Sequence, residues 1–198
     1  MNSKNETFSG SQSGHTPIRR SVKLQNSPHH SPSVRVFKHS AHPVLDVFGP
    51  TLQFLTTPKE ADESFCVMKG IIPPGGIVPM HSHAGIECFL MMSGHQEVLI
   101  ETDGNYSWTM CSSEDFVQVP SLAKHAFRNL SAEPAVTLVT TTAKLGRFFE
   151  DVGRPVATEA QLLPPTPEEL QHFAATAIRY GYWLATPEEN AAVGLPHF

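Results

Sequence analysis

The chain has 198 residues, a formal net charge of −5, 40% hydrophobic and 17% charged residues, which is the composition of an ordinary globular protein. This length predicts one domain with additional terminal segments. The chain contains no apolar run of about 18 residues, so we expect no transmembrane helix and no membrane partner. The acidic balance argues against a nucleic-acid binder, because such proteins usually carry a basic excess or patch.

Residues 1–40 differ in composition from the rest of the chain. Six basic residues and one acidic residue occur between positions 1 and 38, among many Ser, Asn, Pro and His residues and without an apolar period. We therefore predict a disordered polar tail over residues 1–40. Two alternatives stay open: this basic segment could contact an anionic surface, or it could be an organelle transit peptide. A secretory signal is not expected.

The three cysteines are Cys66, Cys88 and Cys111. Their odd number and wide spacing argue against a disulfide framework and predict reduced thiols in a reducing compartment. We expect a cytoplasmic protein in which the cysteines act as small apolar core residues.

Between residues 41 and 150, short apolar runs alternate with turn-forming clusters, which predicts an all-β barrel or sandwich. The expected strands cover residues 44–48, 52–55, 65–72, 87–92, 97–101, 106–110, 116–119, 125–129 and 136–142. Asp103 and Gly104 tolerate the positive φ angles that a tight hairpin requires, so we expect a hairpin turn over residues 102–105.

Residues 151–198 are expected to form a helical extension that packs on the barrel. Thr166 and Glu169 have the spacing of a capping box, and Gly181 is a candidate helix end. The apolar stripe of the helix is expected at Leu170, Phe173, Ala174, Ala177 and Ile178. A second Thr-Pro-Glu-Glu sequence at residues 186–189 predicts another short helix.

The segment between Gly75 and Gly94 contains a pattern of potential metal ligands. His81 and His83 are two residues apart, so both side chains point to one face if they lie on a strand. Glu87 follows at an even spacing across an expected bend at residues 84–85, and it can face the same interior. Two imidazoles and one carboxylate that converge in a barrel form a divalent-metal site.

This segment resembles the first motif of the cupin superfamily, and residues 114–129 resemble the second. Pro120, His125 and Asn129 stand where the second motif has them. The resemblance implies a cupin double-stranded β-helix, a jelly-roll barrel, with His125 as the fourth metal ligand beside His81, His83 and Glu87. Glu114 and Leu122 depart from the motif, which prefers glycine at both positions, so we expect the loop over residues 120–124 to be reshaped.

Three imidazoles and one carboxylate leave two positions open on a six-coordinate metal ion. This donor set favours Fe, Mn, Ni or Co over Zn or Cu. Phe89, Met91 and Phe127 share the parity of the ligands, so they are candidate substrate-pocket residues, and the alternative is that they fill the core. Lys124 has the opposite parity to His125 and is expected to point outward, with an anion-binding role as the alternative.

A narrower resemblance concerns residues 145–155 and 165–181, which look like the end of single-domain quercetin-dioxygenase-like cupins. It implies a metal-dependent dioxygenase that cleaves a small enolic or aromatic, flavonol-like substrate with O₂. Glu87 would then act as the catalytic base.

Two other functions stay open from the sequence. One is a non-oxidative cupin enzyme such as an isomerase or decarboxylase, and the other is a metal-containing cupin that binds a small molecule without turnover. The expected partners are a small-molecule substrate and a second copy in a homodimer, with no nucleic acid.

Overall fold

The computed structural model describes residues 33–37, 42–156 and 164–196. The tail predicted over residues 1–40 therefore lies largely outside the described residues. The chain divides into two units, Met1–Val36 and Phe37–Phe198. In the first unit, residues 33–36 form neither helix nor strand. Within the described ranges, no helix is long and apolar enough to cross a membrane.

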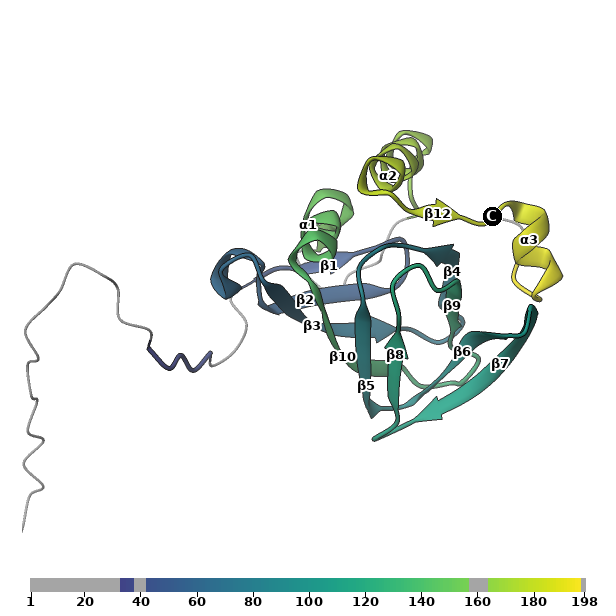
Figure 1. Cartoon of the computed structure of the whole chain (residues 1–198), viewed down its shortest axis with the longest axis horizontal. Coiled ribbons are helices and arrows are strands. Elements are labelled where there is room, and N and C mark those ends of the chain that lie inside the picture. Colours follow the sequence, from purple (N-terminus) through teal and green to yellow (C-terminus); the bar gives the residue numbers. More distant parts are fainter. Residues whose placement is uncertain (1–32, 38–41, 157–163, 197–198) are drawn as a thin grey trace, which may run out of the picture. The chain divides into compact units, whose positions relative to one another are not determined.

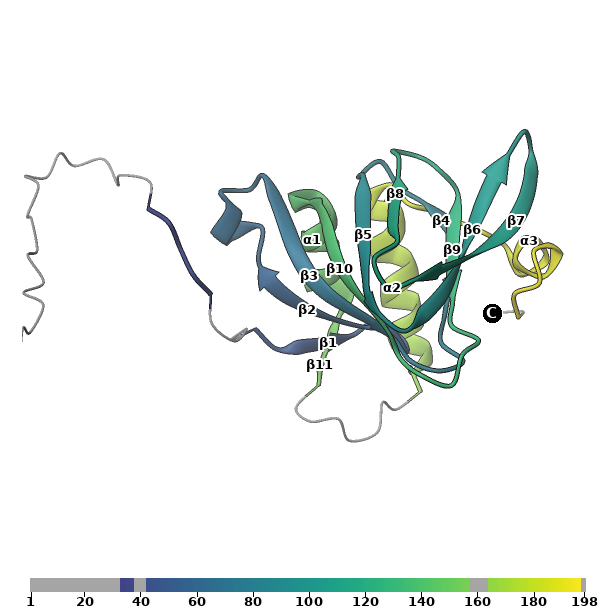
Figure 2. The same ribbon diagram turned by 90° about the horizontal axis from the view of Figure 1, so that it is seen from below.

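The second unit is built on two antiparallel sheets (Figures 1 and 2). In spatial order, the large sheet contains Arg154–Val156 (β11), Val44–Asp46 (β1), Thr51–Thr56 (β2), Phe65–Ile72 (β3), Ala135–Thr142 (β10), Glu87–Ser93 (β5) and Phe116–Val119 (β8). The small sheet contains Trp183–Leu184 (β12), Ile77–Ser82 (β4), His125–Arg128 (β9), His95–Thr102 (β6) and Asn105–Ser112 (β7). The predicted all-β jelly roll is confirmed.

Side chains from the inner faces of both sheets meet in a shared core. β3 shows the pattern that produces it, because Cys66, Met68 and Ile72 are buried at alternate positions. The cluster between the sheets consists of Ile72, Met91, Val98, Cys111, Val119, Phe127 and Ala135. The three cysteines are free, as expected.

The hairpin between β6 and β7 has the turn that the sequence predicts. Thr102 pairs with Asn105, and the two residues between them have positive φ angles of 52° at Asp103 and 78° at Gly104. Aspartate and glycine tolerate this left-handed conformation better than most residues.

Three strands were not foreseen, namely β4, β11 and β12. The segment after residue 150 thus contributes a strand to each sheet as well as helices. Trp183 pairs with Ser82 and Leu184 with His81, so β12 extends the small sheet along β4. Beyond the strands, the described part of the unit contains the short 3-10 helix Lys59–Ala61 (η1) and the α-helices Ala143–Val152 (α1), Pro167–Tyr180 (α2) and Pro187–Ala192 (α3).

The predicted helix caps are confirmed at both C-terminal helices. Thr166 and Glu169 form a capping box at α2, and Thr186 and Glu189 form another at α3. Gly181 ends α2 in the left-handed conformation with φ 83°.

The predicted apolar stripe of α2 is wrong at its two ends. Leu170 is 48% exposed and Ile178 is 72% exposed. The buried face is rotated, because Phe173, Ala177 and Tyr180 contact Phe148 and its neighbours on α1. Phe173, Ala177 and Tyr180 are spaced by four and three residues. They therefore form an apolar stripe with the same helical period as the expected one, but on a rotated face of the helix.

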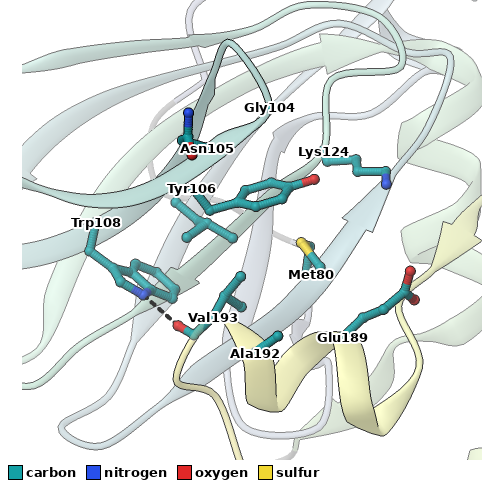
Figure 3. Close-up of a pocket in the computed structure, with 10 residues that line it drawn as sticks. Met80, Gly104, Asn105, Tyr106, Trp108, Lys124, Glu189, Ala192 and Val193 are labelled. Carbon is teal, nitrogen blue, oxygen red and sulfur yellow. Dashed lines mark hydrogen bonds between the residues drawn. The ribbon is translucent and has the colours of Figure 1, made fainter.

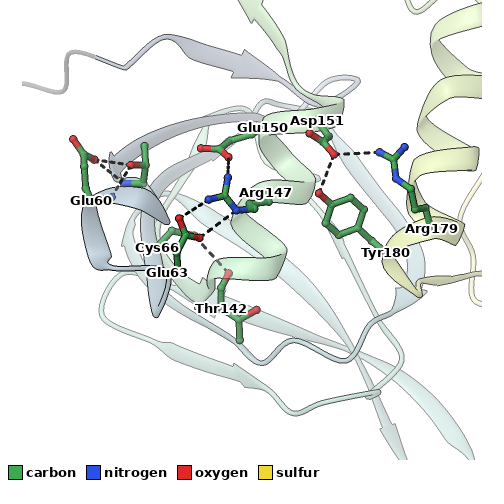
Figure 4. Close-up of polar contacts among 10 residues, drawn as sticks. Glu60, Glu63, Cys66, Thr142, Arg147, Glu150, Asp151, Arg179 and Tyr180 are labelled. Atoms are coloured by element: carbon green, nitrogen blue, oxygen red, sulfur yellow. Dashed lines mark hydrogen bonds and ion pairs between the residues drawn. The ribbon is translucent and has the colours of Figure 1, made fainter.

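Ion pairs and hydrogen bonds hold α1 against its neighbours (Figure 4). Arg147 pairs with Glu63 in the segment before β3 and with Glu150 on its own helix. Asp151 accepts hydrogen bonds from the Tyr180 hydroxyl at 2.8 Å and from Arg179 at 3.2 Å. These contacts fix α2 beside the barrel and so determine where the segment after it begins.

Candidate metal centre

Three histidines converge between the two sheets, as the sequence predicts. His81 lies on β4 opposite His125 on β9, and His83 follows the end of β4. The ring centroids are 4.2 Å apart for His81 and His125 and 5.1 Å apart for His83 and His125. One ligand nitrogen from each ring lies within 4.8 Å of the others. The three imidazoles could bind a metal ion.

A backbone carbonyl fixes the orientation of each ring. Nδ1 of His81 lies 2.8 Å from the oxygen of Pro79, and Nδ1 of His83 lies 2.8 Å from that of Gly85. Nδ1 of His125 lies 2.8 Å from the oxygen of Ala123. Because a carbonyl oxygen can only accept, each Nδ1 carries a proton, and a ring in this tautomer presents the lone pair of Nε2. This arrangement is typical of metal-binding histidines, whose second nitrogen donates to a carbonyl or carboxylate.

Glu87, at the start of β5, faces the same cluster. It is 4% exposed, and its Oε2 lies 3.3 Å from Nε2 of His83 and 3.6 Å from Nε2 of His125. Nε2 of His125 is buried without a hydrogen-bond partner among the described residues. A carboxylate oxygen and imidazole lone pairs that face one another are all acceptors, and a cation between them would satisfy every one.

The electrostatic state of the centre suits a cation. Burial of the His81 ring, together with the neighbouring His125, lowers the pKa of His81 from 6.5 to about 3, which keeps it neutral. Burial alone would raise the pKa of Glu87, but the neighbouring His125 and His83 imidazoles outweigh it and lower the pKa from 4.5 to about 2. At neutral pH the centre therefore contains a neutral His81 ring and an ionised Glu87 carboxylate.

The loops beside the centre are tied to it by backbone hydrogen bonds. The N–H of Leu122 donates to the oxygen of His83 at 2.8 Å, and the Thr141 hydroxyl donates to the oxygen of Ile86 at 2.7 Å. Leu122 has φ 64° and Glu114 has φ 75°. The expected reshaping of the loop is wrong, because both residues adopt the left-handed conformation for which the motif prefers glycine.

The three candidate pocket residues point inward, but they do not line the open cavity. Met91 is 1% exposed and Phe127 is 4% exposed, both within the core between the sheets. Phe89 packs on Phe127 with ring centroids 4.9 Å apart. The cavity that reaches His125 has a volume of about 670 Å³ and is lined instead by residues of β6, β7 and β8 and of the segment before β9. Its inner wall includes Val98, Cys111 and Val119.

Tyr182 is a residue of this site that the sequence analysis missed. Its ring lies parallel to that of His81, with centroids 5.9 Å apart, and 4.9 Å from that of His83. Its other neighbour is Phe148, at 4.4 Å. Burial raises the pKa of Tyr182 above its usual range, and the charge of Glu87 adds to this effect. In the sequence, the available signal was that Tyr182 directly follows Gly181, the candidate helix end. Its partner His81, however, lies about 100 residues earlier in the chain.

Residues 68–141 match the family model described as Cupin domain. No curated protein sequence matches the chain. Among solved structures, a predicted oxalate decarboxylase from Thermotoga maritima is 14% identical, with a TM-score of 0.47, 55% of this chain covered and 98% of the other. The Lactobacillus farciminis oxalate decarboxylase formate complex is 18% identical with a TM-score of 0.45, and the match covers 51% of this chain. The chain spans only 31% of that decarboxylase.

A cupin-superfamily sugar phosphate isomerase from Silicibacter pomeroyi is 21% identical with a TM-score of 0.41. In that case 48% of this chain and 59% of the other are covered.

Proposed function

From the premise that residues 68–141 match the cupin domain and the barrel is a cupin double-stranded β-helix, we propose that this protein is a metal-dependent dioxygenase. Its substrate would be a small enolic or aromatic compound of the flavonol type. The metal ion would be Fe, Mn, Ni or Co, held by His81, His83, Glu87 and His125.

The orientation of the imidazoles carries this proposal. Three rings donate Nδ1–H to backbone carbonyls and present Nε2 to one point, and the Glu87 carboxylate faces the same point. A barrel that used these histidines only as hydrogen-bond donors would not need to direct Nε2 of His83 and of His125 toward a carboxylate.

When bound, the metal ion would supply a Lewis acid that activates the enol of the substrate. Glu87 is ionised, so it can accept the proton of the enol hydroxyl, while the apolar wall of Val98 and Val119 lines the route to His125. Tyr182 covers the rings of His81 and His83 and is itself backed by Phe148, so the open cavity provides the route for substrate. Both atoms of one O₂ molecule add to the substrate as a carbon–carbon bond breaks, and no external reductant is consumed.

The first experiment is anaerobic metal analysis of the full chain, followed by oxygen uptake with a flavonol and a panel of enolic compounds. The expected result is about one Fe, Mn, Ni or Co per chain and uptake of O₂ that depends on substrate. Bound metal without O₂ uptake would replace the dioxygenase by a non-oxidative or binding cupin. Absence of tight metal would overturn the ligand assignment.

The role of Glu87 as base needs its own variant. Glu87→Gln keeps the shape of the side chain but cannot take the proton, so turnover should fall by about 100-fold or more in the metal-loaded protein. Metal analysis of the same sample separates loss of the base from loss of the ion. A metal-loaded variant with full turnover would exclude the role.

A further inference from the structure

A second cavity lies on the outer side of the small sheet, between the β6–β7 hairpin and α3 (Figure 3). Its volume is about 440 Å³, within the range of small-molecule sites. Met80 and Leu99 form its floor and are 4% and 2% exposed. They belong to an apolar cluster separate from the one between the sheets, because they point to the other face of their strands. We call this cavity the outer groove.

The walls of the outer groove are held in place. Nε1–H of Trp108 donates to the oxygen of Val193 at 2.8 Å, and the Arg128 guanidinium lies 4.0 Å from the centroid of the Trp108 ring. Asn190 on α3 is 2% exposed and accepts a hydrogen bond from the N–H of Met80 at 2.9 Å. Helix, floor and aromatic wall thus form a preorganised surface, which lowers the entropic cost of binding.

Two opposite charges are positioned at one side of the groove. The Lys124 ammonium lies 4.3 Å from the centroid of the Trp183 ring. Glu189 is held by its capping box, in which Oε2 accepts the N–H of Thr186 at 2.8 Å. Within the part of the chain that the structure describes, neither charged group forms an ion pair. Figure 3 shows both on the same side of the groove, with Trp108 on the opposite side.

We propose that the outer groove binds a zwitterion of the α-amino acid type with an aromatic side chain. Lys124 pairs with the carboxylate, Glu189 pairs with the ammonium group, and the ring lies against Tyr106 and Trp108. A ligand that carried only a negative charge would be repelled by Glu189, and a ligand that carried only a positive charge would be repelled by Lys124. The charge pattern therefore selects a molecule that carries both.

This site is independent of the proposed dioxygenase function. The outer groove adjoins the cavity that reaches His125, since Leu99 and Lys124 line both. Its own charged groups, however, include none of the four candidate metal ligands. Binding in the outer groove should therefore not require metal.

The two tryptophans of the chain provide the signal for the test. Trp108 lines the outer groove, and Trp183 contacts the Lys124 ammonium. The full chain is titrated with L-phenylalanine under excitation that selects tryptophan, with calorimetry as a second measurement. Both are repeated with 3-phenylpropionate, which lacks the ammonium group, and with 2-phenylethylamine, which lacks the carboxylate. The same titrations are run on metal-loaded and chelator-treated protein.

Saturable binding of about one L-phenylalanine per chain is expected, and each half-charged analogue should bind at least about tenfold more weakly. Lys124→Met keeps the aliphatic stem and should weaken L-phenylalanine binding about tenfold. Glu189→Gln should do the same, and it retains a residue that supports the capping box. Lys144→Met, at an exposed lysine on α1, is the matched control and should change nothing.

Several results would overturn the proposal. One is no saturable binding of L-phenylalanine by either method. Another is equal affinity for the half-charged analogues, or unchanged affinity in Lys124→Met. Binding that disappears on chelation would place the ligand at the metal centre and not in the outer groove.

Discussion

Three peptide carbonyls determine how the histidines of the metal centre present their nitrogens. The backbone oxygens of Pro79, Gly85 and Ala123 each accept a hydrogen bond from one Nδ1–H. The orientation of every ring therefore depends on the backbone two residues away. A substitution that moves these carbonyls would therefore weaken metal binding without touching a ligand.

Removal of one ligand should abolish tight metal binding. We expect His83→Ala to lower metal affinity by more than about 100-fold, because the loss of a ligand exceeds the loss of a supporting hydrogen bond. The metal content per chain after dialysis measures the effect. His95→Ala is the control, since His95 is exposed on β6 and bonded only to Ser112 among the described residues. Equal metal content in both variants would contradict the assignment.

The metal-free protein should lose stability as the pH falls below 6.5. The pKa of His81 is lowered from 6.5 to about 3 by burial, so between these values the unfolded chain binds more protons than the folded one. The free energy of unfolding then decreases by up to about 1.4 kcal/mol per pH unit on acidification. Glu87 contributes in the same direction below pH 4.5, because its folded pKa is also lowered.

Denaturant unfolding at a series of pH values measures this slope. His81→Gln should flatten the curve between pH 6.5 and 4.5, where Glu87 is still ionised in both states. A slope as steep as that of the unmodified protein would show that another group is responsible.

Among the structural elements, those that depend on neighbouring residues, such as helix caps and turns, were predicted correctly from the sequence. The capping box at Thr166 and the hairpin turn at Asp103 each depend on neighbours in the chain, and each is observed. β4 was not among the expected strands; it contains Pro79, and its pairing with β9 is irregular between Val78 and His81.

Contacts between distant segments could not be predicted in this way. The four candidate ligands were identified because their spacing follows a known motif. Tyr182 reaches His81 only because β12 pairs with β4, and a two-residue strand leaves no periodic signal. The rotated face of α2 is a similar case, since two stripes of equal periodicity compete and packing on α1 decides between them.

The turn before β9 stores conformational energy that glycine would relieve. Leu122 has φ 64° and is 65% exposed, so its side chain contributes little packing. We expect Leu122→Gly to raise the free energy of unfolding by up to about 1 kcal/mol, because a left-handed conformation costs leucine about 1–2 kcal/mol and this relief exceeds what glycine loses by adding freedom to the unfolded chain. Denaturant unfolding measures the change.

Leu130→Gly is the matched control for that substitution. Leu130 is 68% exposed and is not among the described residues with positive φ. The control should lower stability by up to about 1 kcal/mol, because glycine adds freedom to the unfolded chain. A loss of stability in both variants would show that the left-handed turn is not strained.

For the whole molecule, the metal centre joins both sheets. Glu87 comes from the large sheet, and His81 and His125 come from the small one. A metal ion bound there would cross-link them, so metal-loaded protein should unfold at a higher temperature than chelated protein. The gain is about 2.7 kcal/mol at a free metal concentration 100 times the dissociation constant. Scanning calorimetry tests this, and His83→Ala should show no gain.

The pairing of β12 with β4 has a practical consequence for anyone who expresses the barrel alone. The family match ends at residue 141 and the following helix, α1, ends at Val152, so a cut just after α1 would be a natural one. That cut would remove β12 and turn β4, the strand that carries His81, into an open edge with unpaired N–H and C=O groups. It would also uncover Met80 and Phe148, which are now buried. Open edges beside apolar surface pair with other chains, so such a fragment should aggregate, and its insolubility would say nothing about the fold of the intact protein.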